Sequence, residues 1–300
     1  GRERTERHRE PEGVRGADAE RVGRATALCP HELTLDHALR ADLVIGDYNQ
    51  AFAPDIHLRL FAGDRSWVLV VDEAHQLPDR AREWGSPRLL TSWAVEAISW
   101  LSGEPWRGVR ELAEAIHAEI VESELRAIQP LVDALLVELP VARWADLRDR
   151  VEEVAWDHAR MRSEVGEDPW VVLSRGVLAF AGALERSGEE TVALWDNQGL
   201  RLLCRDPARL LGARFGTAQA SICLSATLSP DWFFREALGL DRDRTDICSV
   251  PSPFPPEHRH VVMVPGVSTA WRHRERDRAA IVALLERCVA AVPGNTAVYF

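Results

Sequence analysis

The sequence predicts an α/β protein in which a parallel sheet is interrupted by an insert of helices. Two apolar segments, 67–71 and 221–224, each run directly into a polar motif, which is typical of buried parallel strands with functional residues at their carboxyl ends. A long stretch between them has the three- and four-residue spacing of helices and no recognisable motif. Strand and helix patterns alternate again after residue 190, as in a parallel α/β sheet.

Composition limits the classes of protein that fit. The chain has 300 residues, of which 46% are hydrophobic, and a net charge of −11. This length favours two or three domains with sizeable cores. The negative net charge argues against a protein that binds nucleic acid through its overall charge, but it is compatible with a local basic groove. No apolar run approaches the roughly 20 residues that span a bilayer and no signal peptide is visible, so we expect a cytoplasmic protein without a membrane partner.

Cysteine and lysine usage carry further information. The five cysteines are widely spaced and odd in number, which favours a reducing compartment over a disulfide framework. All 36 basic residues are arginine. A phosphate-binding loop of the form GxxxxGK[ST] needs a lysine, so no such loop is present in this sequence. We therefore expect the chain to be part of a longer protein, and its start without methionine and its apolar last residues, 296–300, favour the same expectation.

The most informative segment is 67–75, Trp-Val-Leu-Val-Val-Asp-Glu-Ala-His. Nucleoside triphosphatases use a strand that ends in two carboxylates to hold magnesium and to activate water. In this interpretation Asp72 lies near the metal and Glu73 orients or deprotonates the attacking water. The alternative is that both residues only cap a helix beginning near Gln76, because acidic side chains interact favourably with a helix N-terminus.

Other elements follow from periodicity. We expect residues 1–24 to be solvated, 31–39 to be helical and 41–45 to be a short strand. Helical faces are predicted at Val109, Leu112, Ile116 and Ile120, at Leu147, Val151 and Val154, and at Leu173, Val177, Phe180 and Leu184. A hairpin is predicted at 191–203, strands at 221–224, at 261–264 and from Ala297, and a helix with Ile281, Leu284, Leu285 and Cys288 on one face.

A second motif, Ser225-Ala226-Thr227, follows the apolar segment 221–224. By itself it has an ordinary explanation, since hydroxyl side chains often cap turns at strand ends. Placed far downstream of Asp-Glu-Ala-His, and also after a strand, it completes a pair that resembles motifs II and III of superfamily 2 helicases. With Cys29-Pro30, the helical insert and Ser-Pro-Phe at 252–254, the chain resembles the XPD/DinG family of iron–sulfur DNA helicases from about residue 28 onward.

The resemblance implies a RecA-like motor domain with an α-helical, Arch-like insert and the start of a second RecA-like domain. The implied divisions are a charged segment left from the iron–sulfur region at 1–28, motor domain 1 at 29–87 and 191–245, the insert at 88–190, and motor domain 2 from 246 to 300. The arginine-bearing motifs of the second motor domain are absent from this sequence.

The resemblance also implies roles for individual residues. Asp72 would hold Mg²⁺ through water, Glu73 would activate the hydrolytic water of ATP, and His75 would couple this site to the second motif. A structural, hydrogen-bonding role is an equal alternative for His75. Ser225 and Thr227 would relay the nucleotide state to the grip on DNA, with strand-end capping as the alternative.

The cofactor implied by the resemblance is a [4Fe–4S] cluster, for which Cys29 would be one of four thiolate ligands. The alternative for Cys29 is a small buried residue. Cys204, Cys223, Cys248 and Cys288 lie in apolar patterns, so we expect them to pack in cores.

Several residues have two interpretations. The basic run 272–278 could contact phosphates, but such runs are more often a solvated helix face. The tryptophans could stack on bases, although packing of the insert on the motor core is favoured; they are Trp84, Trp93, Trp100 and Trp106. Tyr48 and Asn49 follow a predicted strand, where contact with DNA or nucleotide is plausible.

The sequence thus predicts an ATP-dependent DNA helicase that acts on single-stranded and forked DNA, with 5′ to 3′ polarity and a role in DNA repair by resemblance. The 300 residues alone are expected to be inactive because no phosphate loop is present. A non-catalytic, helicase-like module that binds nucleic acid or protein is the alternative. An RNA-directed motor with the same Asp-Glu-Ala-His motif is a third option, weakened by the Cys-Pro segment and the insert.

Overall fold

The computed structural model describes residues 16–26, 28–54, 67–161, 168–258, 261–291 and 294–299. The chain divides into two compact units, Gly1–Asp246 and Ile247–Phe300, and each is described by itself. The first unit contains both motifs singled out in the sequence. Its strands form two separate sheets, one of two strands and one of five.

A parallel pair of strands carries the two motifs. β1 (Val68–Val71) pairs with β7 (Ala220–Cys223), with Val68 opposite Ala220 and Val71 opposite Cys223. Parallel neighbours need a long crossover, and here it is the whole stretch between the two strands. The expectation of a parallel sheet with a motif after each strand is confirmed for this pair.

Helices cover one face of this pair. α3 (Tyr48–Phe52), α4 (Leu77–Trp84) and α9 (Ala208–Phe215) contribute to one buried cluster with β1. In that cluster the ring of Phe52 meets the ring of Phe215 edge-on, with centroids 5.2 Å apart. Chain from the end of α10 (Asp231–Ala237) closes the cluster with Leu238. At the next residue, Gly239, φ is +66° and an added Cβ would lie 2.0 Å from the Ala208 carbonyl oxygen, so this close approach requires glycine.

The other face of the pair differs from the expectation of fully buried strands. Val68 and Val70 are 54% and 63% exposed, and Ile222 of β7 is 50% exposed. Side chains alternate between the two faces of a strand, and within the described residues only the face with Val71 is covered. A continuous apolar run was therefore sufficient to predict the strand but not which of its residues are buried.

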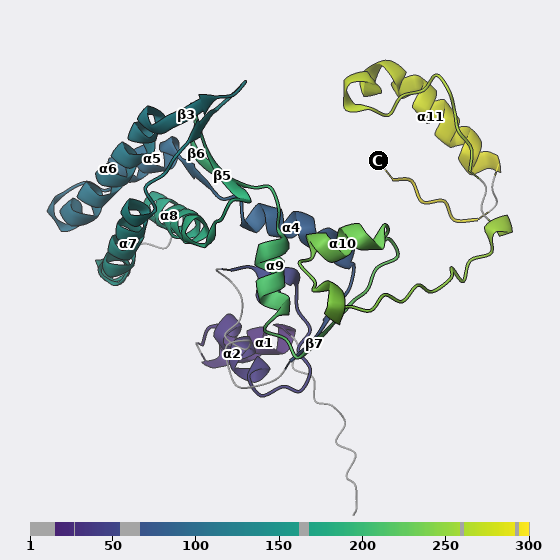
Figure 1. The fold of residues 1–300 in the computed structure, drawn as a ribbon, viewed down its shortest axis with the longest axis horizontal. Coiled ribbons are helices and arrows are strands. Elements are labelled where there is room, and N and C mark those ends of the chain that lie inside the picture. Colours follow the sequence, from purple (N-terminus) through teal and green to yellow (C-terminus); the bar gives the residue numbers. More distant parts are fainter. Residues whose placement is uncertain are drawn as a thin grey trace, which may run out of the picture. The chain divides into compact units, whose positions relative to one another are not determined.

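The five-stranded sheet and four helices form a second region of this unit, which we call the lobe (88–204). Its strand order is β2-β6-β5-β4-β3 and all pairings are antiparallel. The strands are β2 (Arg88–Leu90), β3 (Ala127–Pro130), β4 (Leu135–Val137), β5 (Thr191–Asp196) and β6 (Gly199–Cys204). The helices are α5 (Thr91–Trp100), α6 (Arg107–Glu122), α7 (Val141–Met161) and α8 (Pro169–Arg186) (Figure 1).

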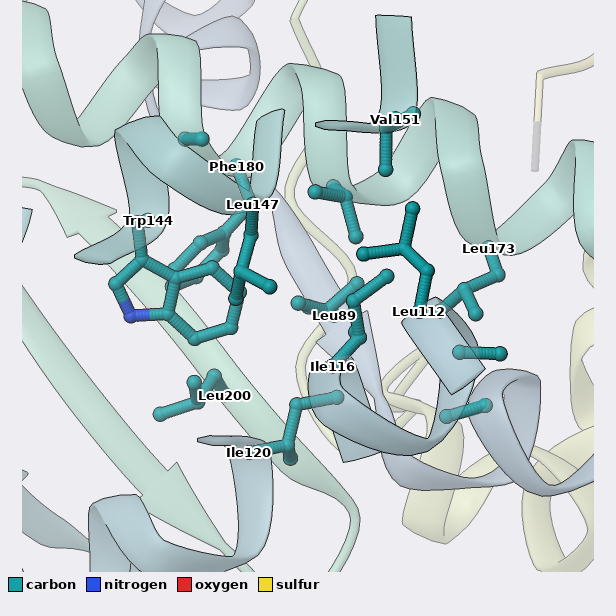
Figure 2. Close-up of a cluster of buried hydrophobic side chains, with 14 of the residues drawn as sticks. Leu89, Leu112, Ile116, Ile120, Trp144, Leu147, Val151, Leu173, Phe180 and Leu200 are labelled. Atoms are coloured by element: carbon teal, nitrogen blue, oxygen red, sulfur yellow. The ribbon is translucent and has the colours of Figure 1, made fainter. Parts of the chain in front are cut away.

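The three helical faces expected from periodicity lie in the core of the lobe. Figure 2 shows Leu112, Ile116 and Ile120 of α6 gathered with Leu147 and Val151 of α7 and with side chains of α8. The Trp144 and Phe180 rings lie 5.1 Å apart in this core. Each fully buried aliphatic or aromatic side chain stabilises such a core by about 1.5–3 kcal/mol, so the lobe has a substantial core of its own.

The hairpin at 191–203 is present, but it does not join the parallel sheet. β5 and β6 pair with each other and with β4 and β2, so the hairpin forms the middle of the lobe sheet. The reason is burial: Leu200 and Leu202 of β6 lie in the same core as α6, α7 and α8. The insert is therefore a mixed α/β lobe rather than helices alone, and the return to the parallel pair comes after Cys204.

Other expected elements also differ. Residues 41–45, 261–264 and 297–299 form no strand, because no described strand lies beside them to complete a ladder of hydrogen bonds. α2 (Pro30–Ala38) confirms the helix expected at 31–39, whereas α1 (Gly16–Thr26) replaces part of the expected solvated segment. Residues 1–15 lie outside the described part.

In the second unit, α11 (Arg274–Ala291) confirms the predicted helix. However, none of its described residues is fully buried: of its expected apolar face, Ile281, Leu284 and Leu285 are half-buried and Cys288 is exposed. Among all described helices of the chain, none is long and apolar enough to cross a bilayer.

Candidate functional site

The chain changes direction sharply after β1. Glu73 has φ +48° and ψ 39°, the left-handed conformation, and it is the one described residue other than glycine with positive φ. This conformation costs roughly 1–2 kcal/mol for a residue with a Cβ. A single 3₁₀ turn, Ala74–Gln76, then leads into α4, which carries Pro78 in its first turn. Asp72 and Glu73 therefore lie at the end of a strand and before a helix, as expected, but in a strained turn.

Main-chain hydrogen bonds tie this turn to the segment after β7. Leu224 N–H donates to the Val71 carbonyl at 2.8 Å, and Ala74 N–H donates to the Leu224 carbonyl at 2.9 Å. The Glu73 N–H donates to Asp72 Oδ1 at 2.9 Å. The alternative that the two carboxylates merely cap α4 is not what the geometry shows, since α4 receives no side-chain cap.

His75 connects the two motifs. Its Nδ1 lies 2.8 Å from Ser225 Oγ and 3.2 Å from Glu73 Oε2. Ser225 Oγ in turn accepts the Thr227 N–H at 3.2 Å and lies 3.4 Å from Thr227 Oγ1. The structure thus brings Glu73 and His75 together with Ser225 and Thr227, and His75 and Ser225 are 150 residues apart in sequence.

Tyr48 is a site residue that the sequence did not single out for this role. Its hydroxyl donates to the main-chain carbonyls of both Asp72 and Glu73, and the bond to Glu73 measures 3.0 Å. Burial, followed by the charges of Asp72 and Glu73, raises the pKa of Tyr48 above its usual value, which keeps the hydroxyl protonated as a donor. A separation of 24 residues between Tyr48 and Asp72 left no local pattern that could have revealed this contact.

The neighbours of Tyr48 fix its position. Asp47 caps α3 by accepting the Gln50 N–H at 3.1 Å. Asn49 Oδ1 accepts the Trp84 indole N–H at 3.0 Å, which joins α3 to the end of α4. Tyr48 and Asn49, for which the sequence had suggested contact with DNA or nucleotide, thus make contacts within the protein. Trp84, for which packing was favoured over stacking on bases, packs against the buried cluster of β1.

The donor set at this edge suits a hard cation. Asp72 is exposed and the Glu73 side chain is 56% exposed, so both carboxylates are open to solvent on the side of the sheet edge. The Ser225 hydroxyl is linked to this edge through His75, whose Nδ1 lies 2.8 Å from Ser225 Oγ and 3.2 Å from Glu73 Oε2. Carboxylate oxygens with room for water are the ligands that Mg²⁺ prefers, so the residues present fit a hydrated magnesium ion.

The cysteines do not fit an iron–sulfur cluster in the same way. Cys29 is exposed at the start of α2, and no group of three metal-binding side chains occurs anywhere in the described ranges. A [4Fe–4S] cluster needs four cysteines. Cys29 is also not the small buried residue that was the alternative. Of the other four, Cys204 is buried and Cys223 is half-buried, but Cys248 and Cys288 are exposed in the second unit, so core packing is wrong for these two.

The rate of alkylation should distinguish the exposed cysteines from the more buried ones. Burial raises the pKa of Cys223 to about 11, and burial also raises the pKa of Cys204. At pH 8 the reactive thiolate of Cys223 should be about 100-fold scarcer than that of a thiol at the usual value. We expect iodoacetamide to label Cys29, Cys248 and Cys288 well before Cys204 and Cys223, as followed by peptide mass spectrometry over time. Equal labelling of Cys29 and Cys223 in the native protein would contradict the packing described here, and urea-unfolded protein is the control.

The basic run 272–278 and the tryptophans make contacts with other residues of the protein. Arg276 forms an ion pair with Asp277 at 2.7 Å, and the side-chain hydrogen bond from Arg276 lowers the pKa of Asp277 to about 2. Arg274 lies over the Trp271 ring at 5.6 Å. Trp93 and Trp106 pack against the lobe core, while Trp100 contacts the Trp106 ring at 5.7 Å. These contacts favour a solvated helix face and packing over contact with phosphates and bases.

The site joins two motifs: a parallel pair of strands presents Asp-Glu-Ala-His beside Ser-Ala-Thr, with His75 between them. The family model DEAD_2 matches residues 3–92, a segment that includes β1, the acidic pair and Tyr48. The resemblance to XPD-type helicases is confirmed, and the chain carries a DEAD_2 domain over that segment.

Solved structures agree at the level of the fold. One, described as "XPD_Helicase", is 18% identical with a TM-score of 0.52, and the match covers 75% of this chain and 39% of that one. Another, described as "Truncated XPD", is 17% identical with a TM-score of 0.52 and covers 78% of this chain and 66% of that one. The chain thus spans well under half the length of the first of these proteins.

Proposed function

We propose that the protein containing these residues is an ATP-dependent DNA helicase of the XPD/DinG type. It would act in the cytoplasm on single-stranded and forked DNA, moving 5′ to 3′ and coupling hydrolysis to unwinding. The observation that carries the proposal is the contact of His75 with both Glu73 and Ser225, because it joins the catalytic carboxylate to the second motif. A motor needs such a connection between hydrolysis and its grip on the track.

The roles follow from the chemistry of each side chain. Magnesium, when bound, neutralises charge on the triphosphate. Asp72 would hold the hydrated ion, and Glu73 would orient the attacking water and take up its proton. His75 would pass a change at Glu73 to Ser225 and Thr227, whose hydroxyls report to the segment after β7. The lobe would correspond to the Arch-like insert, and residues from 247 onward to the start of a second motor domain.

The residues described above supply neither a phosphate-binding loop nor an iron–sulfur cluster. Hydrolysis requires a phosphate loop, and a lysine-bearing loop of this kind would have to come from outside a sequence that contains no lysine. The proposal contains no step that depends on an iron–sulfur cluster, because the described residues offer Cys29 no partners for one.

The absence of a phosphate-binding loop from this sequence also favours a second candidate function. A non-catalytic, helicase-like module that binds nucleic acid or another protein would keep the fold without needing a phosphate loop. The intact Asp72–Glu73 pair argues against it, since a binding module gains nothing from two adjacent exposed carboxylates in a strained turn.

The test is the ATPase rate of the full gene product that carries these residues, measured with and without single-stranded DNA. We expect a turnover of roughly 10 per second with DNA, the usual range for enzymes, and a much lower rate without it. Forks with a 5′ or a 3′ single-stranded tail then test the polarity of unwinding. Tight DNA binding without hydrolysis under either condition would instead support the binding module.

A further inference from the structure

The strained turn at Glu73 has a dedicated support outside its own segment. The Tyr48 hydroxyl donates to the carbonyls of Asp72 and Glu73, which lie on the two sides of the Glu73 Cα, the residue in the left-handed conformation. Asp47 and Asn49 fix α3 at both sides of Tyr48, through the cap on Gln50 and the bond from Trp84. The hydroxyl is therefore held in place by contacts that do not involve the acidic pair.

The contact concerns the backbone alone. Tyr48 donates to carbonyl oxygens and leaves the carboxylates of Asp72 and Glu73 open to solvent. A hydrogen bond to both carbonyls resists rotation about φ and ψ of Glu73, and these rotations decide where the Glu73 side chain points. Because the Glu73 carboxylate lies 3.2 Å from His75 Nδ1, the same rotations would also alter the link to Ser225.

We propose that Tyr48 is a positioning residue for hydrolysis, whose hydroxyl holds Glu73 in its left-handed conformation and so aims its carboxylate at the attacking water. This inference rests on the proposed function for its consequence in catalysis. The support of the Glu73 turn by the Tyr48 hydroxyl, in contrast, does not depend on any activity.

The test is Tyr48→Phe, which removes the hydroxyl and keeps the ring. In the full-length protein, kcat for DNA-stimulated hydrolysis should fall about tenfold, the equivalent of one well-placed hydrogen bond, while KM for ATP changes less than about twofold. A merely structural role would lower stability without this split between kcat and KM. Tyr299→Phe is the matched control, because Tyr299 is the other of the two tyrosines in the sequence and is 92% exposed.

A second variant separates positioning of Glu73 from a general loss of stability. Leu238→Ala removes a fully buried side chain from the same cluster but leaves both the Tyr48 hydroxyl on the two carbonyls and the bond from Trp84 to Asn49. It should lower the unfolding temperature while leaving kcat within about twofold of wild type. A Tyr48→Phe protein that keeps wild-type kcat, or one whose loss of kcat is matched by Leu238→Ala, would overturn the inference.

A measurement without turnover distinguishes failure of this inference from failure of the proposed function. The Ala74 amide donates across to Leu224, so its hydrogen exchange reports opening of the turn. Tyr48→Phe should speed this exchange about tenfold and Tyr299→Phe should not. If wild type hydrolyses no ATP, the proposed function fails, but the exchange rate of Ala74 still tests whether Tyr48 supports the turn. Exchange at Ala74 that is unchanged in Tyr48→Phe would show that it does not.

Discussion

Replacing Glu73 with glutamine should lower the DNA-stimulated ATPase rate of the full-length protein by about 10²–10⁴-fold, the usual contribution of a positioned general base. Glutamine has nearly the same size and can occupy the same turn, so the fold should persist. Its amide cannot take up a proton from water, which is why the loss should appear in kcat. Binding of ATP should be retained, as measured by fluorescence titration with a nucleotide analogue.

The matched control is Glu83→Gln, on the neighbouring helix. Glu83 is exposed and pairs with Arg80 at 3.1 Å, a surface ion pair of the kind worth at most about 1 kcal/mol. This variant should keep the wild-type rate. If Glu73→Gln retained most of its activity, Glu73 could not be the group that activates water, and the proposed mechanism would be wrong.

The second large effect concerns the lobe. Trp144→Ala should lower the free energy of unfolding of the lobe by about 3 kcal/mol, toward the lower end of the usual range for removing a buried tryptophan. Trp144 is fully buried against Phe180, so the change leaves a large cavity. The cost is not higher because the Trp144 indole N–H is buried without a hydrogen-bond partner in the described structure, and its removal relieves that penalty.

Trp156→Ala provides the control on the same helix, α7. Trp156 is 79% exposed, so its removal should change stability by less than about 0.5 kcal/mol. Urea unfolding followed by circular dichroism compares the two, with the lobe transition treated separately because a chain of several units need not unfold in one step. Similar losses for both variants would show that the lobe core is not centred on Trp144.

Much of the site was predictable because its signals are local. An apolar strand that runs into carboxylates or hydroxyls can be read from consecutive residues, as at 67–75 and 221–227. The structure pairs these two strands in parallel and so places both motifs at one sheet edge. The hydrogen-bond partner of each polar group could not be predicted from the sequence. The bonds of Tyr48 to the Asp72 and Glu73 carbonyls and of Asn49 to Trp84 join residues with no shared periodicity.

The sequence by itself determined the β1 strand with its acidic pair, the helical faces of α6, α7 and α8, and the hairpin at 191–203, because each depends on residue spacing within one element. Only the tertiary structure decided that this hairpin belongs to the lobe, that one face of β1 is exposed, and that the left-handed turn of Glu73 is held by Tyr48. The physical reason is that spacing fixes which side of an element is apolar, whereas the surface that covers it and the groups that satisfy its hydrogen bonds come from distant parts of the chain.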